Sequence, residues 1–567
     1  MSLYCAPRPG PLNVRPRLVA KLAGMTSRKG FLSASALAAS ALLSPADAVA
    51  VPSTASVQPP SPARRRRALA IRDDAARAHY ANDRATNTAN GDELRYADKR
   101  ASFSKTLPHD DLGEVDAAAF ARFVAIVERG DPAGFDAMPR DEIAVDRLND
   151  PQAMYAYDYV ATDSAATRMP PPPAFASARM AVEMGELYWH ALTLDVPFME
   201  FGSNPLVAAA VTDLNAFPEP LTDNAKKLDA ATLFRCEFAG ALRGPFVSQF
   251  LWLEVPYGPA TIVQRYRFPA RGQRFVTTGH EWLACQRGAA GKAKIVSIEP
   301  RWAATNSDLA AYVHKDFSFQ AFMHAALIAI SYGPEALSLT NPYRSSKTQF
   351  GDITFGNKMF LTLIAQAAII AQKTSYYHKW LVHRRLRPEV MGGRIQHQLT
   401  SRKDYGIHPS ILRADAVARA KSQQGTAFLA LAYPEGCPTH PSYPAAHACN
   451  AGACATVLKA FFNESFVIPN TVVANATGDA LEPWRETPLT LGGEFEKLAA
   501  NISFARHAAG VHYRSDSLAG LLTGERQGLS LLSDYSTTFN ERFAGFELTT
   551  FGGERVRIRD GAISTQG

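Results

Sequence analysis

The chain has 567 residues, of which 47% are hydrophobic and 20% are charged. These fractions are typical of a globular protein and exclude a globally disordered or collagen-like chain. No apolar run reaches the ~18 residues that a spanning helix needs, which excludes a polytopic membrane protein. The formal net charge is +7, but residues 1–48 carry six basic residues and one acidic residue, so the remainder has a charge of about +2. A nucleic-acid partner is therefore not indicated, and any anion site must be local.

Residues 1–50 have the features of an export signal. Arg28 and Lys29 precede an apolar, Ala-rich stretch over 31–43, and the small residues ADAVA follow at 46–50. A charged start, a short apolar middle and an A-x-A end describe a cleavable signal rather than an anchor. The order Ser-Arg-Lys-x-Phe-Leu resembles a bacterial twin-arginine signal, so we expect a periplasmic or secreted protein; a disordered basic tail is the alternative. Residues 51–99 begin Pro-rich and Arg-rich and are predicted to be a linker and N-terminal extension.

The cysteines allow two interpretations. Five remain after removal of the signal, and an odd number in an exported chain leaves at least one free thiol or an intermolecular bond. A disulfide near Cys437 and a set of buried thiols are both compatible with the spacing. The five are Cys236, Cys285, Cys437, Cys449 and Cys454.

The body of the chain is predicted to be helical, with one strand-like island. Helical spacing of apolar residues occurs at 117–129, 174–194, 318–331 and 359–382. The segments 262–268 and 274–278 are rich in β-branched and aromatic residues and are separated by Pro and Gly, which predicts a small β-hairpin. No phosphate-binding Gly-rich motif and no G-x-S-x-G are present, so nucleotide-binding folds and an α/β-hydrolase receive little support.

Three short segments carry residues suited to chemistry, and the first runs from Lys379 to Glu389. If it ends a helix, Lys379 and Arg387 are separated by about 80° of rotation and can face one pocket. Pro388 is expected to end that helix. An ammonium and a guanidinium that converge suit a tetrahedral oxyanion, although a basic helix end facing solvent is the simpler alternative.

The second segment is HPSYPAAH at 440–447. Pro444 and the small residues after it predict a helix start whose backbone N–H groups can point at an anion. His447 would then stand in the first turn, beside whatever is bound. Taken alone, the segment fits equally well a helix start with surface histidines.

The third segment runs from Ser503 to Asp516. Arg506 and His512 would lie on different helix faces, but Gly510 can break the helix and let both reach one site. Ser515 is a candidate cap for the next helix. Asp516 is placed to accept a hydrogen bond from a nearby His or Arg and so to orient it.

Together the three segments resemble a known family. Lys-x7-Arg-Pro, Pro-small-small-His and Ser-x2-Arg-x5-His-x3-Asp, in this order, are similar to the vanadium-dependent haloperoxidase and type-2 acid phosphatase superfamily. The algal and bacterial bromoperoxidase-like branch is the most similar, on RPEVMGGRI at 387–395, the two histidines of HPSYPAAH, and the segment 491–516. LPHDDLGEVD at 107–116, NDPQAMYAYD at 149–158 and YGPATIVQRYRF at 257–268 add to the likeness.

The resemblance implies a fold and a set of residue roles. The expected fold is all-α, with two four-helix bundles in one domain over 100–550, a hairpin within 255–285 and a tail over 551–567. The cofactor would be vanadate, and the partners would be hydrogen peroxide, a halide (bromide first) and a small organic substrate, in a homo-oligomer. By this resemblance, His512 would be the metal ligand, and the vanadate oxygens would contact Lys379, Arg387, Ala446 and Arg506. His447 would be the catalytic acid–base histidine, and His440 a second catalytic histidine near the halide and peroxide side. Asp516 would be a supporting hydrogen-bond acceptor.

The sequence departs from the family at one site position. The family usually has Pro-Ser-Gly-His, whereas this chain has Ala445 and Ala446 before His447. The missing hydroxyl removes a hydrogen bond to a charged group, worth about 1.5–3 kcal/mol. Three alternatives to a haloperoxidase therefore stay open: a phosphatase with His512 as nucleophile, a cofactor-free family member, and an oxyanion-binding protein without activity.

Overall fold

The computed structural model describes residues 61–81, 86–289, 291 and 293–566. The chain divides into two compact units, residues 1–72 and 73–567, and the features discussed below belong to the second. The export signal predicted for residues 1–50 lies outside the described residues. No described helix is both long enough and apolar enough to span a membrane.

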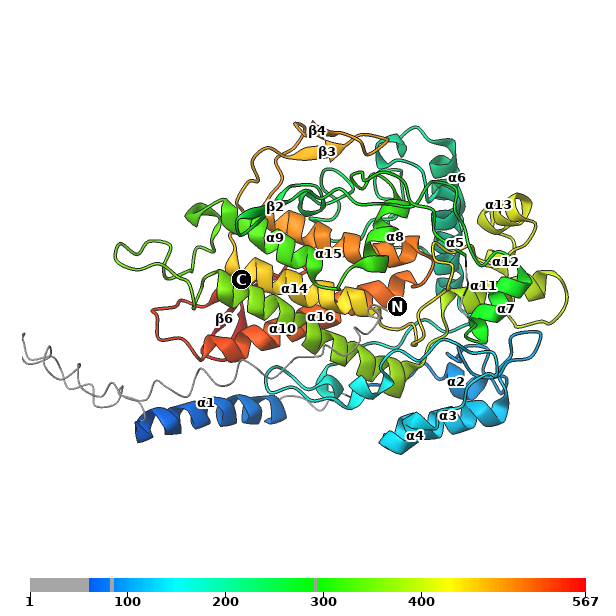
Figure 1. The fold of residues 1–567 in the computed structure, drawn as a ribbon, viewed down its shortest axis with the longest axis horizontal. Coiled ribbons are helices and arrows are strands. Elements are labelled where there is room, and N and C mark those ends of the chain that lie inside the picture. Colours follow the sequence, from blue (N-terminus) through cyan, green and yellow to red (C-terminus); the bar gives the residue numbers. More distant parts are fainter. Residues whose placement is uncertain (1–60, 82–85, 290, 292, 567) are drawn as a thin grey trace, which may run out of the picture. The chain divides into compact units, whose positions relative to one another are not determined.

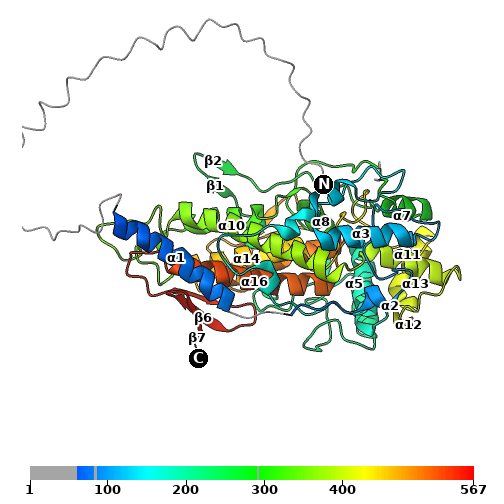
Figure 2. The ribbon, with the colours of Figure 1, turned by 90° about the horizontal axis from the view of Figure 1, so that it is seen from below.

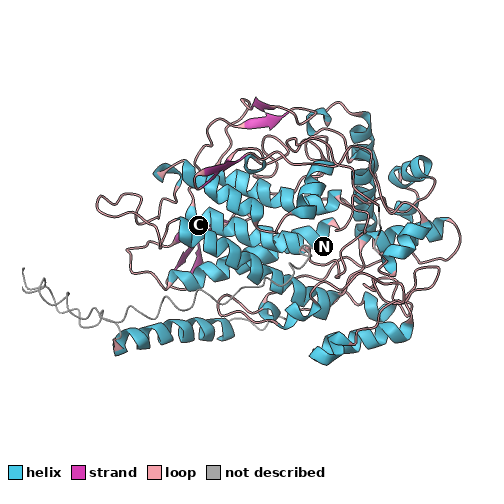
Figure 3. Ribbon diagram, viewed as in Figure 1, coloured by secondary structure: helices cyan, strands magenta, loops and turns pink. Residues whose placement is uncertain are grey.

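Most of the regular structure is helical, which confirms the predicted all-α class (Figure 3). The α-helices are α1 (Pro62–Ala81), α2 (Asp92–Arg95), α3 (Ala117–Arg129), α4 (Pro132–Asp136), α5 (Ala178–Thr193), α6 (Pro205–Leu214), α7 (Gly279–Gln286), α8 (Asn306–Lys315), α9 (Gln320–Ser331), α10 (Asn357–Tyr377), α11 (Pro388–Leu399), α12 (Pro409–Leu412), α13 (Asp415–Gln424), α14 (Ala446–Phe461), α15 (Leu491–Ala508) and α16 (Arg514–Ser536). Short 3₁₀ helices are η1 (Pro151–Tyr155), η2 (Ser164–Ala166), η3 (Phe198–Glu200), η4 (Gln249–Leu251) and η5 (Pro334–Ala336), and η6 (His378–His383) is a π-helical turn.

A bundle of α10, α14, α15 and α16 forms one core, and α14 packs against the other three helices. Figure 1 shows α14 between α15 and α10, and Figure 2 shows α10, α14 and α16 side by side. Gly520, Gly524 and Gly528 recur every fourth residue and therefore share the face of α16 that meets α14. A Cβ atom on Gly524 would lie only 1.9 Å from the carbonyl oxygen of Cys449. The bundle thus depends on direct backbone contact between α14 and α16.

A second helical group, with its own apolar core, surrounds α5. Helices α6, α12 and α13 pack on α5, which runs across the direction of the bundle (Figure 1). Trp189 and Trp282 are almost completely buried in this second core. Two helical groups with separate cores agree with the architecture that the resemblance implied.

The four predicted helices are all present, with ends shifted by a few residues. The segment 117–129 coincides with α3, because Asp116 caps its start and Gly130 ends it in the left-handed conformation. The segments 174–194 and 318–331 shorten to α5 and α9. The segment 359–382 divides into α10 and η6, so the regular α-helix ends earlier than its apolar pattern indicated.

Strands form three small antiparallel sheets: β1 (Val255–Tyr257) with β2 (Ala260–Ile262), β3 (Val472–Ala474) with β4 (Leu481–Pro483), and β5 (Phe546–Thr549), β6 (Arg555–Arg559) and β7 (Ala562–Thr565) in that order. The predicted hairpin window of 255–285 does hold β1 and β2, but the predicted strand pair was wrong. Ile262 belongs to β2, and the two predicted strands otherwise make isolated bridges, from Tyr266 to Arg301 and from Phe275 to Leu431. The partners of these two aromatic residues are distant in sequence. The three-stranded sheet packs on α14 and α16 and includes part of the predicted tail.

The five cysteines of the body are free and buried, so a disulfide near Cys437 is wrong. Burial raises the pKa of the Cys437 thiol well above its usual value. The sulfhydryl instead lies 3.8 Å from the carbonyl oxygen of Gly510. These cysteines are therefore buried apolar packing residues, the alternative that the spacing had left open.

Candidate functional site

Lys379 and Arg387 converge by a different route from the one predicted. A shared helix was wrong: Lys379 lies in η6, the backbone of Arg384 is left-handed (φ 34°), and Pro388 begins α11 instead of ending a helix. Proline is favoured at a first helical position because its missing N–H would be unpaired there in any case. Arg387 is the N-cap of α11. An interruption of the helix between Lys379 and Arg387, and not helical periodicity, thus brings the two cations together.

The second predicted segment does begin a helix. Ala445 is the N-cap of α14, no side chain caps this end, and Ala446 and His447 fill the first turn. The N–H of Ala445 donates to the carbonyl oxygen of Asp516 (2.9 Å), which ties the start of α14 to the start of α16. The first-turn N–H groups of α14 are thereby presented without a competing side-chain acceptor.

The third segment breaks where predicted. Helix α15 ends at Ala508, and Gly510 has a φ of 76°, which favours glycine. Arg506 therefore lies in the last turn of α15, and His512 follows the break. The predicted cap was wrong: Tyr513 is the N-cap of α16, and Ser515 lies inside the helix, where its hydroxyl donates to Glu183 (2.7 Å).

Three buried cations lie around this site, and we call Lys379, Arg387 and Arg506 the oxyanion cage. Lys379 donates to the carbonyl oxygens of Pro441 (2.8 Å) and Ser442 (2.9 Å). Arg387 donates from Nε to the His440 carbonyl (2.8 Å) and from Nη1 to the Val511 carbonyl (2.8 Å). The Nη1 of Arg506 donates to the Val313 carbonyl (3.0 Å), and its Nε is buried without a partner among the described residues.

None of the three cage cations forms an ion pair within the described part of the chain. An uncompensated buried charge costs several kcal/mol, because water is removed and no counter-charge replaces it. Burial, and then the nearby Arg387, lowers the pKa of Lys379 well below its usual value. Burial lowers the pKa of Arg387 to about 10. The charges around this site therefore call for an anion.

His512 is fixed by contacts on both ring nitrogens. Its Nδ1 lies 3.0 Å from Asp516 Oδ2, and its Nε2 lies 3.0 Å from Arg387 Nη1. A carboxylate that accepts from Nδ1–H leaves the lone pair on Nε2, on the side of the cage. Burial, and then the charge of Arg387, lowers the pKa of His512 well below its usual value. The imidazole is thus held neutral with Nε2 available as a ligand atom.

The other two predicted histidines have distinct surroundings. His447 is partly buried, and its Nε2 lies 3.0 Å from Asp316 Oδ1, so a carboxylate orients it. His440 is buried, with Nδ1 2.9 Å from Arg387 Nη2 and its ring 5.5 Å from that of Tyr376. The structure therefore brings Arg387, His440 and His512 into direct contact. Arg506 contacts Val313 and His447 contacts Asp316, three residues farther along the same segment.

Several supporting residues escaped the sequence analysis. Arg385 donates to Asp516 Oδ1 (2.7 Å), and the Ser442 hydroxyl donates to Asp516 Oδ2, so Asp516 has partners on both oxygens. Arg385 and Ser442 lie inside the motifs already singled out and could have been suspected. Asp316 lies 131 residues before His447 and carries no local signal.

The residues present fit a tetrahedral oxyanion bound through a metal atom. Three cations without carboxylates, an uncapped helix start and one neutral imidazole nitrogen supply charge, hydrogen bonds and a ligand. Ala445 is fully buried and adds no hydroxyl. Within the described residues, no cluster of carboxylates lies at the cage, so its chemistry does not suit a hard divalent cation.

The chain is similar to vanadium-dependent haloperoxidases in sequence and in structure. A family model described as the second helical-bundle domain of VCPO matches residues 362–541. The vanadium-dependent bromoperoxidase of Ascophyllum nodosum is 33% identical over 496 residues, which cover 83% of this chain and 88% of that protein. The vanadium-dependent bromoperoxidase of Corallina pilulifera is 31% identical over 566 residues, covering 83% and 94%. The homohexameric structure of the second vanadate-dependent bromoperoxidase of Ascophyllum nodosum matches with a TM-score of 0.84 and 26% identity, covering 89% of this chain and 92% of that chain.

Proposed function

Because the chain belongs to the vanadium-dependent haloperoxidase family, we propose that it is a vanadate-dependent bromoperoxidase. It uses hydrogen peroxide to oxidise a halide, bromide first, to a hypohalous acid equivalent that halogenates small organic substrates. The observation that carries the proposal is the oxyanion cage, whose three buried cations have no carboxylate partner, beside a neutral His512.

The chain's own residues divide the work as follows. His512 Nε2 would ligate the metal of vanadate, the cage side chains would neutralise its oxygens, and the N–H of Ala446 would donate to one of them. When bound, vanadate would supply the Lewis acid for oxidation of a halide by hydrogen peroxide. His447, oriented by Asp316, holds and moves the proton, and His440 lies beside Arg387 on the halide and peroxide side.

Replacement of His512 and replacement of His447 should have different effects, and this difference tests the roles assigned to the two histidines. His512→Ala should abolish tight vanadate binding, because the cage alone holds the anion only electrostatically. His447→Ala should still bind vanadate and should slow bromination by about 10²–10⁴, the usual worth of a positioned acid–base group. Equilibrium dialysis gives the vanadate affinity, and a peroxide-dependent bromination assay gives the rate.

A buried histidine outside the site provides the control. His324→Gln, on α9, should leave vanadate affinity and bromination rate near the parent values. If His512→Ala binds vanadate as tightly as the parent, the ligand assignment is wrong and the proposal fails with it. Efficient phosphate-monoester hydrolysis by vanadate-free protein, without bromination after loading, would replace the proposal by a phosphatase that uses His512 as nucleophile.

The assembly and location of the protein extend the proposal. The structural relative is a homohexamer, and we expect this chain also to form a homo-oligomer, which light scattering of the purified protein would check. A mass of one chain at working concentration would contradict this.

We further propose that the protein is exported, with cleavage near Val49 or Val51. N-terminal sequencing of protein from its native host tests this. A mature protein that retains Gly30 would reject cleavage.

A further inference from the structure

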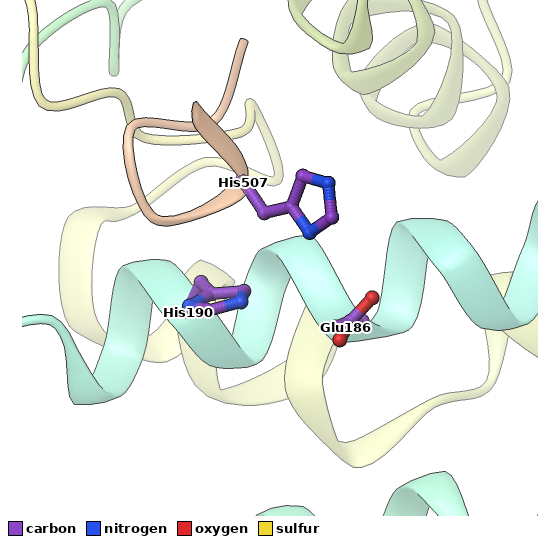
Figure 4. Close-up of side chains that lie close together, drawn as sticks. All are labelled: Glu186, His190 and His507. Atoms are coloured by element: carbon purple, nitrogen blue, oxygen red, sulfur yellow. The ribbon is translucent and has the colours of Figure 1, made fainter. Parts of the chain in front are cut away.

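A second cluster of ligand-type side chains lies outside the oxyanion cage. Glu186 and His190 are one turn apart on α5, and His507 reaches them from α15 (Figure 4). One ligand atom from each residue lies within 4.8 Å of the others, and all three residues are buried. Glu186 and His190 share a helix face because they are four residues apart.

The two histidines leave ring nitrogens unpaired at this point. His190 is 1% exposed, and neither Nδ1 nor Nε2 has a partner among the described residues. His507 is fully buried, with Nε2 2.7 Å from the Ser517 hydroxyl and Nδ1 unpaired. A buried polar atom without a partner costs about 1–3 kcal/mol. An unpaired ring nitrogen on each of the two buried histidines indicates that something polar binds in the cluster.

The ligand types in the cluster suit a metal cation, whereas the charge of Glu186 is already paired with that of Arg514. A neutral imidazole has one nitrogen lone pair that can bind a metal, and both ring nitrogens of His190 are buried without a partner among the described residues. Glu186 supplies a buried negative charge. Arg514 donates to both of its oxygens (2.6 and 3.1 Å), but each carboxylate oxygen has a second lone pair. Arg514 will weaken cation binding without blocking the ligand atoms.

We propose that Glu186, His190 and His507 form a second metal site, for a divalent transition metal ion such as zinc. Two imidazole nitrogens and one carboxylate oxygen are ligands that zinc accepts, with water as the fourth. Zinc–nitrogen distances of about 2.0–2.1 Å require the side chains to rotate inward from their present spacing. The ion joins α5 of one helical group to α15 of the other, so its role is to hold the two groups together.

A cavity is lined by aromatic side chains that pack on the two histidines of the cluster. A small cavity of about 10 Å³, room for roughly one water molecule, is lined by Phe234 and Phe504. Phe234 stacks on His190 (3.7 Å between ring centroids), and Phe504 lies 4.4 Å from His507. This cavity shares Arg235 and Phe246 with an open pocket of about 660 Å³. The aromatic residues Phe234 and Phe504 thus separate the cluster from these cavities.

Zinc itself is the probe for the test, on the full-length protein treated with chelator and saturated with vanadate. We expect one zinc ion per chain to be retained after buffer exchange, with a rise in Tm because the ion binds the folded state. X-ray absorption at the zinc edge should show two imidazole ligands. His190→Gln should weaken zinc binding at least tenfold and remove the rise in Tm.

Two controls locate the binding. His324→Gln replaces another buried histidine and should keep the zinc affinity, and His512→Gln, tested without vanadate, should also keep it. Loss of zinc binding in His512→Gln but not in His190→Gln would place the ion in the oxyanion cage and overturn the proposal. Failure of the parent to retain zinc would also overturn it and would assign the cluster to a buried water. The result does not depend on the proposed bromoperoxidase activity.

Discussion

Lys379, Arg387 and Arg506 lie buried, and none of them pairs with a carboxylate of the described residues. Main-chain carbonyl oxygens accept from all three, but such a contact cancels no charge, so each cation keeps its attraction for an anion. Asp516, the nearby carboxylate, is held instead by Arg385, Ser442 and His512. The chemical nature of the partner thus separates Arg385, which is paired with a carboxylate, from the three cations of the oxyanion cage, which are not paired with one in the described part of the chain.

Ala445 is the residue at which the site can be strengthened. It is the N-cap of α14, with an extended backbone that suits serine. Ala445→Ser should tighten vanadate binding about tenfold to a hundredfold, since a hydrogen bond to a charged group is worth about 1.5–3 kcal/mol. Vanadate affinity by equilibrium dialysis checks this.

A serine at this position can also cap the helix, so its effect on vanadate binding must be measured separately from its effect on stability. Its hydroxyl could cap α14 and stabilise the vanadate-free protein by about 1 kcal/mol. Thermal unfolding without vanadate reports that effect, whereas the dialysis reports binding. Higher stability with unchanged vanadate affinity would mean that the hydroxyl caps the helix and does not reach the anion.

Elements whose ends are determined by nearby residues were predictable from the sequence. Helix α3 follows from an apolar pattern between Asp116 and Gly130, and the break after α15 follows from Gly510. The route from Lys379 to Arg387 was not predictable in this way. Periodicity continues through η6, and only tertiary packing decides that Arg384 takes a left-handed backbone.

The strand pairings also could not be predicted from local sequence patterns. The β-content of 262–268 and 274–278 was recognised, but their partners lie at Arg301 and Leu431, which no local pattern specifies. Within the site, the predicted residues come from three motifs with local signals. Asp316, which orients His447, comes from a segment without one and required the structure.

The contact between α14 and α16 gives a prediction at the scale of elements. Gly524→Ala places a Cβ atom 1.9 Å from the Cys449 carbonyl oxygen and 2.9 Å from the Ala453 nitrogen, both in backbone that cannot move aside cheaply. Overpacking of this kind costs about 1–3 kcal/mol, which outweighs the gain of about 1 kcal/mol in helix propensity. The Tm of the variant should therefore fall.

A glycine with space around it is the matched control. At Gly493 in α15 the nearest atom to an added Cβ would be the Thr490 hydroxyl at 3.4 Å. Gly493→Ala should leave Tm unchanged or raise it. Equal Tm values for the two alanine variants would show that α14 and α16 are less tightly packed than the structure indicates.

At the scale of the whole molecule, the site lies where the two helical groups meet. Arg387 is the N-cap of α11, whose apolar residues belong to the core around α5, whereas His447 belongs to α14 of the bundle. The loop that follows Arg506 passes from one core to the other, since Ala505 packs in the first and Val511 in the second. Any condition that loosens one group against the other should therefore disturb the cage.

Acid is such a condition, because the fold buries neutral histidines outside the site. Burial lowers the pKa of His109, His324 and His378 to about 4 each, whereas the unfolded chain has the usual value near 6.5. Above pH 6.5 both states are neutral at these positions and stability is unaffected. As pH falls from 6.5 toward 4, the unfolded state binds protons first and the folded state loses stability.

Each of the three histidines should then cost about 2 kcal/mol of unfolding free energy at pH 5 relative to pH 7. Urea denaturation of vanadate-free protein at the two pH values measures the total loss. His324→Gln isolates one contribution, because glutamine keeps a polar group beside Gln264 but does not titrate. The loss between pH 7 and pH 5 should be smaller in this variant by about 2 kcal/mol. An unchanged loss would mean that His324 takes up its proton without unfolding, through a local opening of α9 that exposes the ring to water.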